Sequence, residues 1–251
     1  MHKERADAIL SILKEKGYVT VKYLIEQLHY SNATINRDLN RLAEQKLIKR
    51  YYGGVEILKK TSLSLDFRYH KMHAVKNLVA KKAAEFVCDG MTIFIDGSTT
   101  AQYMAEYLLE KSDIMVITNN MNLVSFLSEH NVNAVCLGGK VVENPYMLYS
   151  SETIENIKSY NADMMFFSTS SFSEDGKILN DELYYTMHKT MAQNSKKVVF
   201  LADSGKLNVN VSRTVFDFSE IDCVITDCDF ASEVMDRCSD TTFINVKTAL
   251  T

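Results

Sequence analysis

The chain has 251 residues, with 28 Lys and Arg against 32 Asp and Glu, a formal net charge of −4 and a hydrophobic content of 46%. Together with a single proline, this composition excludes a disordered chain, and the length allows a small first domain and one sizeable second domain. No apolar run approaches a membrane span, and the charged, polar start is unlike a signal peptide, so we expect a soluble, cytoplasmic protein without a membrane partner.

Two short amphipathic helices are predicted at the start of the chain. Apolar residues recur at helical spacing in two segments: Ala6, Ile9, Leu10 and Leu13, then Val21, Leu24, Ile25 and Leu28. Gly17 can end the first helix in the left-handed conformation. A turn through His29 and Tyr30 joins the second helix to a third, which predicts a helix-turn-helix preceded by one helix.

The segment from Ser31 to Arg50 carries the most informative pattern. Ser31 is a good helix N-cap, because its hydroxyl can accept a hydrogen bond from an amide of the first turn. One stripe of the predicted helix is apolar: Ile35, Leu39 and Leu42. The opposite stripe carries short polar and cationic groups that suit base edges and phosphates. A strand from Leu47, a turn at Gly53-Gly54 and a returning strand over 55–58 predict a basic β-wing after this helix.

A small three-helix bundle that mediates only protein contacts is the alternative for this segment. Residues 1–58 hold 10 Lys and Arg against 7 Asp and Glu, whereas the remainder holds 18 against 25. A basic first domain on an acidic second one favours contact with a polyanion through the first domain alone. The predicted contacts to double-stranded DNA are Ser31, Asn32, Thr34, Asn36, Arg37, Arg41, Arg50 and Tyr51.

The same residues resemble the N-terminal domain of the DeoR family of bacterial transcriptional repressors. That family shows a Ser-x-x-Thr-Ile-Arg-Arg-Asp-Leu stretch followed by an Arg, two residues and Gly-Gly in the wing. The matching positions here are Ser31, Thr34, Ile35, Arg37, Asp38, Leu39, Arg50, Gly53 and Gly54. Asn36 departs from the pattern, since it stands where the family usually has the first of two arginines.

Residues 59–73 show no sustained periodicity and predict a linker, which divides the chain into domains over 1–58 and 74–251. Within the linker, His70 and His73 are three residues apart, but no carboxylate or cysteine companion is near, so we expect no metal there. The five cysteines form no CxxC pair and are expected to be reduced in the interior: Cys88, Cys136, Cys223, Cys228 and Cys238. Neither a zinc site nor a cofactor is predicted.

From residue 74 onward, helices and strands alternate. Helices are predicted over 75–87, from Thr99 to about Leu109, and over 121–129. The predicted strands are TIFID, IMVIT, NAVCLGG, MMFFST, VVFLAD, CVITD and FINV. Continuous apolar strands separated by helices predict an α/β domain with a mostly parallel sheet that is covered on both faces.

Polar and small residues follow five of these strands. They are Asp96-Gly97-Ser98-Thr99-Thr100, Thr118-Asn119-Asn120, Gly138-Gly139-Lys140, Ser168-Thr169-Ser170-Ser171 and Asp203-Ser204-Gly205-Lys206. Ligands of parallel sheets gather beyond the carboxyl ends of strands, and hydroxyls, free amides and helix dipoles there suit a phosphate. The pattern therefore predicts a small anionic ligand at this edge of the sheet.

This half also resembles the DeoR family, in its C-terminal sensor domain. The matches are Lys76, then Asp96, Thr99 and Thr100, then Thr118-Asn119, Gly138-Gly139, Asp203 and Lys206. Two stretches depart from the family pattern: Ser150-Ser151 and Ser168–Ser170. The resemblance implies a sheet related to ribose-5-phosphate isomerases and CoA-transferase-like proteins, and a homodimeric or homotetrameric repressor of a carbohydrate operon that responds to a phosphorylated sugar. The expected effector contacts are Asp96, Gly97, Ser98, Thr99, Thr100, Asn119, Gly139, Lys140, Asp203 and Lys206.

An enzyme is the alternative: a sugar-phosphate isomerase with an appended DNA-binding domain. Aldose–ketose isomerisation needs a positioned base and a group that stabilises the enediolate, and Asp96, Asp203 and Lys206 are candidates for these roles. However, no separate Glu or His follows a predicted strand to complete an acid–base pair. The expectation is therefore a regulator without catalytic residues.

Overall fold

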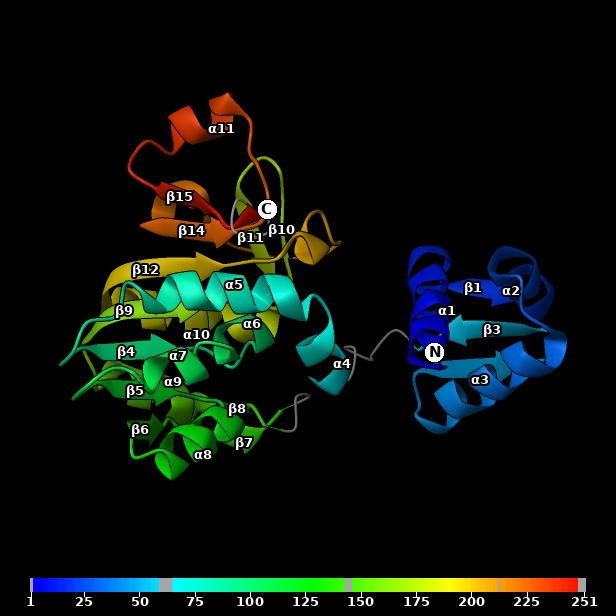
Figure 1. Cartoon of the computed structure of the whole chain (residues 1–251), viewed down its shortest axis with the longest axis horizontal. Coiled ribbons are helices and arrows are strands. Elements are labelled where there is room, and N and C mark those ends of the chain that lie inside the picture. The colour runs from blue at the N-terminus through cyan, green and yellow to red at the C-terminus, as the bar shows by residue number, and fades with distance from the viewer. Residues whose placement is uncertain (1, 59–64, 143–145, 212, 248–251) are drawn as a thin grey trace. The chain divides into compact units, whose positions relative to one another are not determined.

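The computed structural model describes residues 2–58, 65–142, 146–211 and 213–247, and the chain divides into two compact units, Met1–Ser64 and Leu65–Thr251 (Figure 1). The first part of the expected linker, residues 59–64, lies outside the described residues. The later part of the expected linker is not a free segment, because helix α4 spans Leu65–His70 and belongs to the second unit.

The first unit is a winged helix-turn-helix. Its elements are α1 (His2–Lys16), β1 (Tyr18–Thr20), α2 (Val21–Leu28), α3 (Asn32–Glu44), β2 (Ile48–Tyr51) and β3 (Gly54–Ile57). β3 lies between β1 and β2 in an antiparallel sheet, so the predicted wing has a third strand that the apolar pattern did not indicate. The two glycines suit the turn: Gly53 has a φ of 74°, and a Cβ on Gly54 would collide with the ring of Tyr18.

The core of the first unit is built from the stripes predicted in the sequence. Its buried side chains are Ile9, Leu10, Leu13, Val19, Leu24, Ile35, Leu39, Leu42, Ile48 and Val55. A buried ion pair ties α1 to α3, since Arg5 contacts both carboxylate oxygens of Asp38, with Nη2 to Oδ1 at 3.1 Å. Asp38 therefore serves the fold of the helix-turn-helix and does not face solvent.

The second unit is an α/β domain whose helices and strands alternate along the chain. Its helices are α4, α5 (His73–Ala84), α6 (Thr99–Gln102), α7 (Ala105–Leu108), α8 (Met121–Glu129), α9 (Ser151–Lys158), α10 (Glu182–Gln193) and α11 (Ser232–Arg237), with 3₁₀ turns η1 (Ser204–Lys206) and η2 (Phe218–Glu220). The main strands are β4 (Thr92–Ile95), β5 (Met115–Thr118), β6 (Asn133–Cys136), β9 (Ala162–Phe167), β12 (Ser195–Leu201), β14 (Cys223–Thr226) and β15 (Thr242–Asn245). Shorter strands are β7 (Lys140–Val141), β8 (Leu148–Tyr149), β10 (Ser171–Phe172), β11 (Lys177–Asn180) and β13 (Arg213–Asp217).

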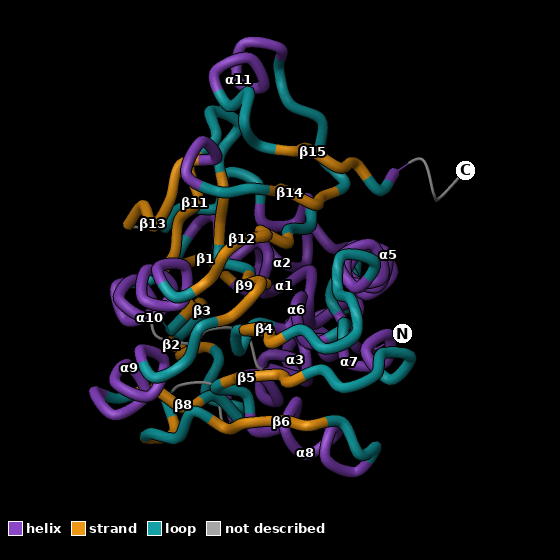
Figure 2. Tube along the Cα trace, turned by 90° about the vertical axis from the view of Figure 1, so that its left-hand side faces the viewer, coloured by secondary structure: helices purple, strands orange, loops and turns teal. Residues whose placement is uncertain are grey.

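Seven strands form one parallel sheet in the order β15-β14-β12-β9-β4-β5-β6. Figure 2 shows this stack of strands with α5, α7 and α8 on one face and α9 and α10 on the other. Alternate strand residues supply the two cores, so that Ile93 and Ile95 pack on the α5 face and Phe94 on the α10 face. From β4 the chain moves to β5 and β6 on one side, and later returns to β9 on the other. β4 and β9 therefore flank the topological switch point of the sheet.

Two sequence-based expectations, one on a helix and one on the cysteines, differ from the structure. The helix expected from Thr99 to about Leu109 is two short helices, because i→i−3 bonds such as Met104 N to Ala101 O (3.0 Å) tighten the turn between them. Cys88 and Cys136 are exposed, since one lies beyond α5 and the other ends the edge strand β6. The remaining cysteines, Cys223, Cys228 and Cys238, are buried as expected.

Candidate functional site

The polar face of α3 is exposed on the first unit. Ser31 caps the helix as predicted, since its hydroxyl accepts from Thr34 N at 3.3 Å and lies 2.9 Å from Thr34 Oγ1. Asn32, Arg37 and Arg41 are exposed to solvent. Because these exposed side chains lie on one helix, they can all contact the same groove of a DNA duplex.

The wing side chains differ in their contacts. Tyr51 Oη donates to Glu56 Oε2 at 2.7 Å and its ring packs edge-on against Tyr18, while the side chain remains exposed. Its neighbour Tyr52 is fully exposed at the turn, and sequence reasoning did not single it out. Arg50 folds back onto α3, where it contacts Asn36.

The switch point between β4 and β9 organises the site in the second unit. Asp96 directly follows β4, and its amide donates to Phe166 O of β9 at 3.1 Å. Ser168 follows β9, and its amide donates to Asp96 Oδ2 at 3.4 Å. Two strand ends that lie 72 residues apart in the chain thus meet at one carboxylate.

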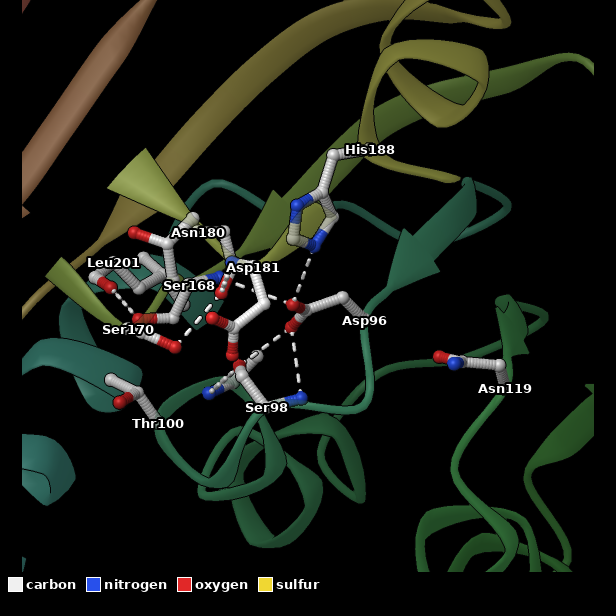
Figure 3. A network of polar contacts seen from close by, with 12 residues as sticks. Asp96, Ser98, Thr100, Asn119, Ser168, Ser170, Asn180, Asp181, His188 and Leu201 are labelled. Carbon is white, nitrogen blue, oxygen red and sulfur yellow. Dashed lines mark hydrogen bonds and ion pairs between the residues drawn. The ribbon is translucent and has the colours of Figure 1, made fainter. Parts of the chain in front are cut away.

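Asp96 is buried and accepts hydrogen bonds from several directions (Figure 3). Ser98 donates twice to Oδ1, from its amide at 3.2 Å and from its hydroxyl at 2.6 Å. On the other side, His188 Nε2 lies 3.1 Å from Oδ2. Because both oxygens accept hydrogen bonds, Asp96 positions the surrounding loops.

Lys76, on α5, contacts the loop after β4 and is buried. Its ammonium donates to Thr99 Oγ1 at 3.1 Å and to the carbonyl of Arg68 on α4. Burial lowers the pKa of Lys76 to about 7, and the neighbouring Lys206 acts in the same direction, whereas Asp203 opposes it. A lysine with this pKa gains a charge readily when an anion binds beside it.

Lys206, on η1 in the loop after β12, reaches the same loop. Its ammonium donates to Thr100 Oγ1 at 3.0 Å and to Ser168 Oγ at 2.6 Å. Burial lowers the pKa of Lys206 as well, while Asp203 and Asp96 favour its charged form. The predicted pairing of the Asp96–Thr100 loop with the Asp203–Lys206 loop is therefore present in the structure.

Other predicted effector residues have structural roles or lie apart from this cluster. Asn119 stands on a separate loop in Figure 3, and its Nδ2 donates to Leu148 O at 2.9 Å. Gly139 has a φ of 120°, and a Cβ there would collide with Thr153 Oγ1. Lys140 is exposed in the β7–β8 hairpin. Gly97 lies beneath Met147, whose Cε would be 2.6 Å from an added Cβ.

His188 contacts Asp96 in this cluster, and sequence reasoning did not single it out. It lies in the middle of α10 among buried apolar residues, where a histidine gives no strand-end signal. Its Nδ1, Asn119 Oδ1 and Asp203 Oδ2 are buried without a hydrogen-bond partner among the described residues. Because Nε2 faces the carboxylate of Asp96, Nδ1 of a neutral ring is an acceptor. Three buried polar atoms without a partner among the described residues therefore lie near the carboxyl ends of the strands.

The two serine stretches that depart from the family pattern are also ordered. Ser150 precedes α9, where its amide donates to Thr153 Oγ1 at 3.0 Å as part of a capping box. Ser168 donates its hydroxyl to Leu201 O, and Ser170 donates to Asn180 Oδ1 at 2.8 Å (Figure 3). Serines at 168 and 170 thus add hydroxyl groups to the switch point.

Helix α4, the first element of the second unit, docks on the same loop. Lys76 holds the carbonyl of Arg68, and Tyr103 Oη donates to Tyr69 O at 2.8 Å. The rings of Tyr69 and Tyr103 stack with centroids 4.6 Å apart. Helix α4 is therefore attached to Tyr103 and to Lys76, and Lys76 also contacts Thr99.

Models of two protein domains match this chain. A DeoR-like helix-turn-helix domain matches residues 5–61, and the DeoR C terminal sensor domain matches residues 71–228. This chain belongs to the DeoR family. It is a DNA-binding transcriptional regulator, and the resemblance seen in the sequence is confirmed.

Curated relatives of the DeoR chain align along nearly its whole length. The Glycerol-3-phosphate regulon repressor of Escherichia coli is 30% identical over 94% of this chain and 95% of its own length. The HTH-type transcriptional repressor GlcR of Bacillus subtilis is 33% identical over 90% of this chain and 88% of its own. Among solved structures, ribose 5 phosphate isomerase A from Neisseria gonorrhoeae covers 55% of this chain and 53% of its own, with 19% identity and a TM-score of 0.39. A similarity of that size says nothing about shared chemistry.

Two further features concern the described residues as a whole. None of the helices in the described ranges is long and apolar enough to cross a membrane. Within the same ranges, no group of three or more His, Cys, Asp or Glu side chains is arranged to hold a metal ion.

Proposed function

We propose that this regulator is a repressor of a carbohydrate operon and that its sensor binds a phosphorylated sugar at the β4–β9 switch point. One observation carries the proposal: two lysines from different elements converge on consecutive threonines, with Lys76 on Thr99 and Lys206 on Thr100. Two ammonium groups and two hydroxyls provide donors for a phosphate. Burial lowers the pKa of both lysines, and a bound anion would raise it again because a negative charge favours the protonated ammonium. The site therefore favours an anionic ligand.

The polyol part of such an effector suits the unpartnered acceptors. Hydroxyl groups of a sugar donate hydrogen bonds, and Asp203 Oδ2 and His188 Nδ1 are buried acceptors without a recorded partner in the described residues. Leaving such atoms unpaired costs free energy, and a donor from a ligand would recover it. This combination favours a phosphorylated sugar over inorganic phosphate.

On the DNA side, we assign the contacts to the exposed face of α3 and to the wing. Arg37 and Arg41 are exposed cations suited to phosphates or guanine edges, and Asn32 lies on the same face. Two such domains in a homodimer or homotetramer would bind two half-sites, which light scattering of the full chain would test. Because the partner is DNA, we place the protein in the cytoplasm.

Helix α4 offers a route between the effector and the DNA-binding unit. A phosphate at Thr99 would compete with the Arg68 carbonyl for the ammonium of Lys76, which would loosen α4 at the start of the second unit. Effector binding would then change the affinity for DNA, and DNA binding would change the affinity for the effector by the same factor, which defines one coupling free energy. Tyr103→Phe removes the bond to Tyr69 O and should change this coupling without removing either site.

A thermal-shift screen tests the proposed effector class, because a ligand that binds the folded state stabilises it by mass action. The panel pairs glycerol 3-phosphate, ribose 5-phosphate, glucose 6-phosphate and fructose 6-phosphate with their unphosphorylated forms. A stabilising phosphate ester whose parent sugar has no effect supports the proposal. If the unphosphorylated forms stabilise equally, or if Lys206→Met leaves the shift unchanged, the proposed phosphate site is wrong.

The contacts of Asp96 argue against the isomerase alternative. Both of its carboxylate oxygens accept hydrogen bonds from neighbouring groups, which makes Asp96 a poor candidate for the catalytic base. The family consists of transcriptional regulators, which the domain matches over both units support. Incubation with ribose 5-phosphate tests this alternative, since measurable conversion to the ketose phosphate would show isomerase activity.

A further inference from the structure

Arg50 lies on strand β2 of the wing, and its side chain extends across to helix α3, where the guanidinium packs. Nη2 donates to the side-chain oxygen of Asn36, and Nη1 donates to the side-chain oxygen of Asn40. Nη1 also lies 3.4 Å from the backbone oxygen of Asn36. Three acceptors on successive turns of one helix thus hold a side chain that comes from another element.

Asn36 is itself fixed by its neighbour on the helix. Its Nδ2 donates to the backbone oxygen of Asn32 at 3.0 Å and to the side-chain oxygen of the same residue. A bidentate contact with adenine requires both the oxygen and the amino group of an asparagine. Since Arg50 takes the oxygen of Asn36 and Asn32 takes the amino group, Asn36 cannot make that contact while this arrangement persists.

The charge of Arg50 is not neutralised by these contacts. All its recorded partners in the described part of the chain are amide or peptide oxygens, which carry no net charge. A guanidinium has five N–H donors, so Nε and one hydrogen of Nη2 remain for another acceptor. Arg50 is half-buried, and its rotamer freedom is therefore lost before any DNA arrives.

We infer that Asn36 and Asn40 are positioning residues, which hold Arg50 of the wing on the exposed face of α3 so that its guanidinium contacts the DNA together with the side chains of that helix. The inference rests on the proposed use of α3 and the wing as the DNA-binding face. Pre-organisation strengthens binding because the ordering entropy is already lost in the free protein. The wing arginine then acts as an additional side chain of the recognition helix.

A double-mutant cycle on the full chain tests this inference. The probe is a duplex that the wild-type protein has enriched from a randomised library, and affinity is measured by fluorescence anisotropy at several salt concentrations. Arg50→Ala should weaken binding by about 5- to 150-fold, as expected for a lost base contact. Asn40→Ala should weaken binding by about 3- to 10-fold, the effect of a lost hydrogen bond, and this effect should nearly vanish in the Arg50→Ala background.

Lys49→Ala provides the matched control, because Lys49 precedes Arg50 on β2 and alternate strand residues face opposite sides. Its effect should add to that of Asn40→Ala. Asn40→Gln keeps an amide acceptor and should recover part of the lost affinity. Circular dichroism of each variant checks that the first unit stays folded. Base preference, measured by repeating the enrichment, should relax at the same position in Arg50→Ala and Asn40→Ala.

Three outcomes would overturn the inference. If Asn40→Ala weakens binding equally with and without Arg50, Asn40 contacts the DNA itself. If Asn40→Ala and Asn36→Ala have no effect while Arg50→Ala does, Arg50 needs no positioning. If Arg50→Ala has no effect, this arginine does not contact DNA. Failure of the proposed DNA-binding face would appear separately, as unchanged affinity in Arg37→Ala and Arg41→Ala.

Discussion

The buried ammonium of Lys76 donates a hydrogen bond to the hydroxyl of Thr99 at 3.1 Å, and this contact joins the effector loop to the first helix of the sensor domain. The same ammonium holds the carbonyl of Arg68 on α4. Lys76 therefore stands between the proposed phosphate site and the segment that follows the DNA-binding unit. Its protonation state affects both.

The stability of the sensor should depend on pH through Lys76. Its pKa is lowered to about 7 in the folded state, whereas an unfolded lysine titrates near 10.4, so the unfolded state binds more protons between these values. The free energy of unfolding should therefore rise with pH across this window, by at most about 1.4 kcal/mol per unit from this group. Below pH 7 both states are protonated and this contribution is flat.

Chemical unfolding of the wild type and Lys76→Met from pH 6 to 9.5 measures this effect. The difference in unfolding free energy, wild type minus variant, should increase with pH above about 7. Lys81→Met is the control, because Lys81 lies on the same helix and is exposed. Parallel curves for wild type and Lys76→Met would show that Lys76 titrates normally.

Arg37 and Arg41 should both matter for DNA affinity, since they are exposed on α3. Arg37→Ala or Arg41→Ala that removes a phosphate contact should lower the slope of log K against log salt by about 1. Removal of a base contact should instead cost about 1–3 kcal/mol and relax specificity. Anisotropy titrations at several salt concentrations distinguish the two cases. Deletion of residues 1–58 should abolish binding while leaving a folded sensor.

Much of the DNA-binding unit was predictable because its signals are local. Helical periodicity, the N-cap at Ser31 and the glycine pair at Gly53-Gly54 each specify structure over a few residues. The position of Arg50 was not predictable, because its contacts with Asn36 and Asn40 depend on how the wing packs against the helix. Periodicity gives no information on such contacts.

The sensor shows the same division between local and non-local information. Continuous apolar runs indicated a parallel sheet, but the neighbour relationship of β4 and β9 comes from strand order, which no run of residues encodes. The meeting of Ser168 with Asp96 follows from that order. The exposure of Lys140 was not predictable either, because it depends on how the chain after the edge strand β6 forms the strands β7 and β8.

Asp96 and His188 should affect the effector site through its geometry. His188→Leu should destabilise the sensor by about 1–3 kcal/mol, because it removes a hydrogen-bond partner from a buried carboxylate. It should also weaken effector binding, since Asp96 orients Ser98 at the start of α6. Thr186→Ala, at an exposed position of α10, should change neither quantity. An unaltered melting temperature in His188→Leu would mean that Asp96 does not depend on this histidine.

Gly139 should prove to be a structural residue and not an effector contact. Gly139→Ala places a Cβ against Thr153 Oγ1 at a φ of 120°, so we expect a loss of about 1–3 kcal/mol in stability. Calorimetry at a temperature where the variant remains folded should give unchanged effector affinity. Gly138→Ala is the milder comparison, because its nearest atom is 3.9 Å away and only its φ of 70° is unfavourable. A loss of affinity without a loss of stability would restore Gly139 to the effector site.

The most direct test of the account is the response of DNA binding to the sugar phosphate found in the screen. Affinity of the enriched duplex is measured with and without that ligand for the wild type and Lys206→Met. We predict that both proteins bind DNA equally in its absence, that the ligand changes the affinity of the wild type by about 5- to 150-fold, and that Lys206→Met responds weakly or not at all. An equal response in Lys206→Met would contradict a phosphate site at the β4–β9 switch point.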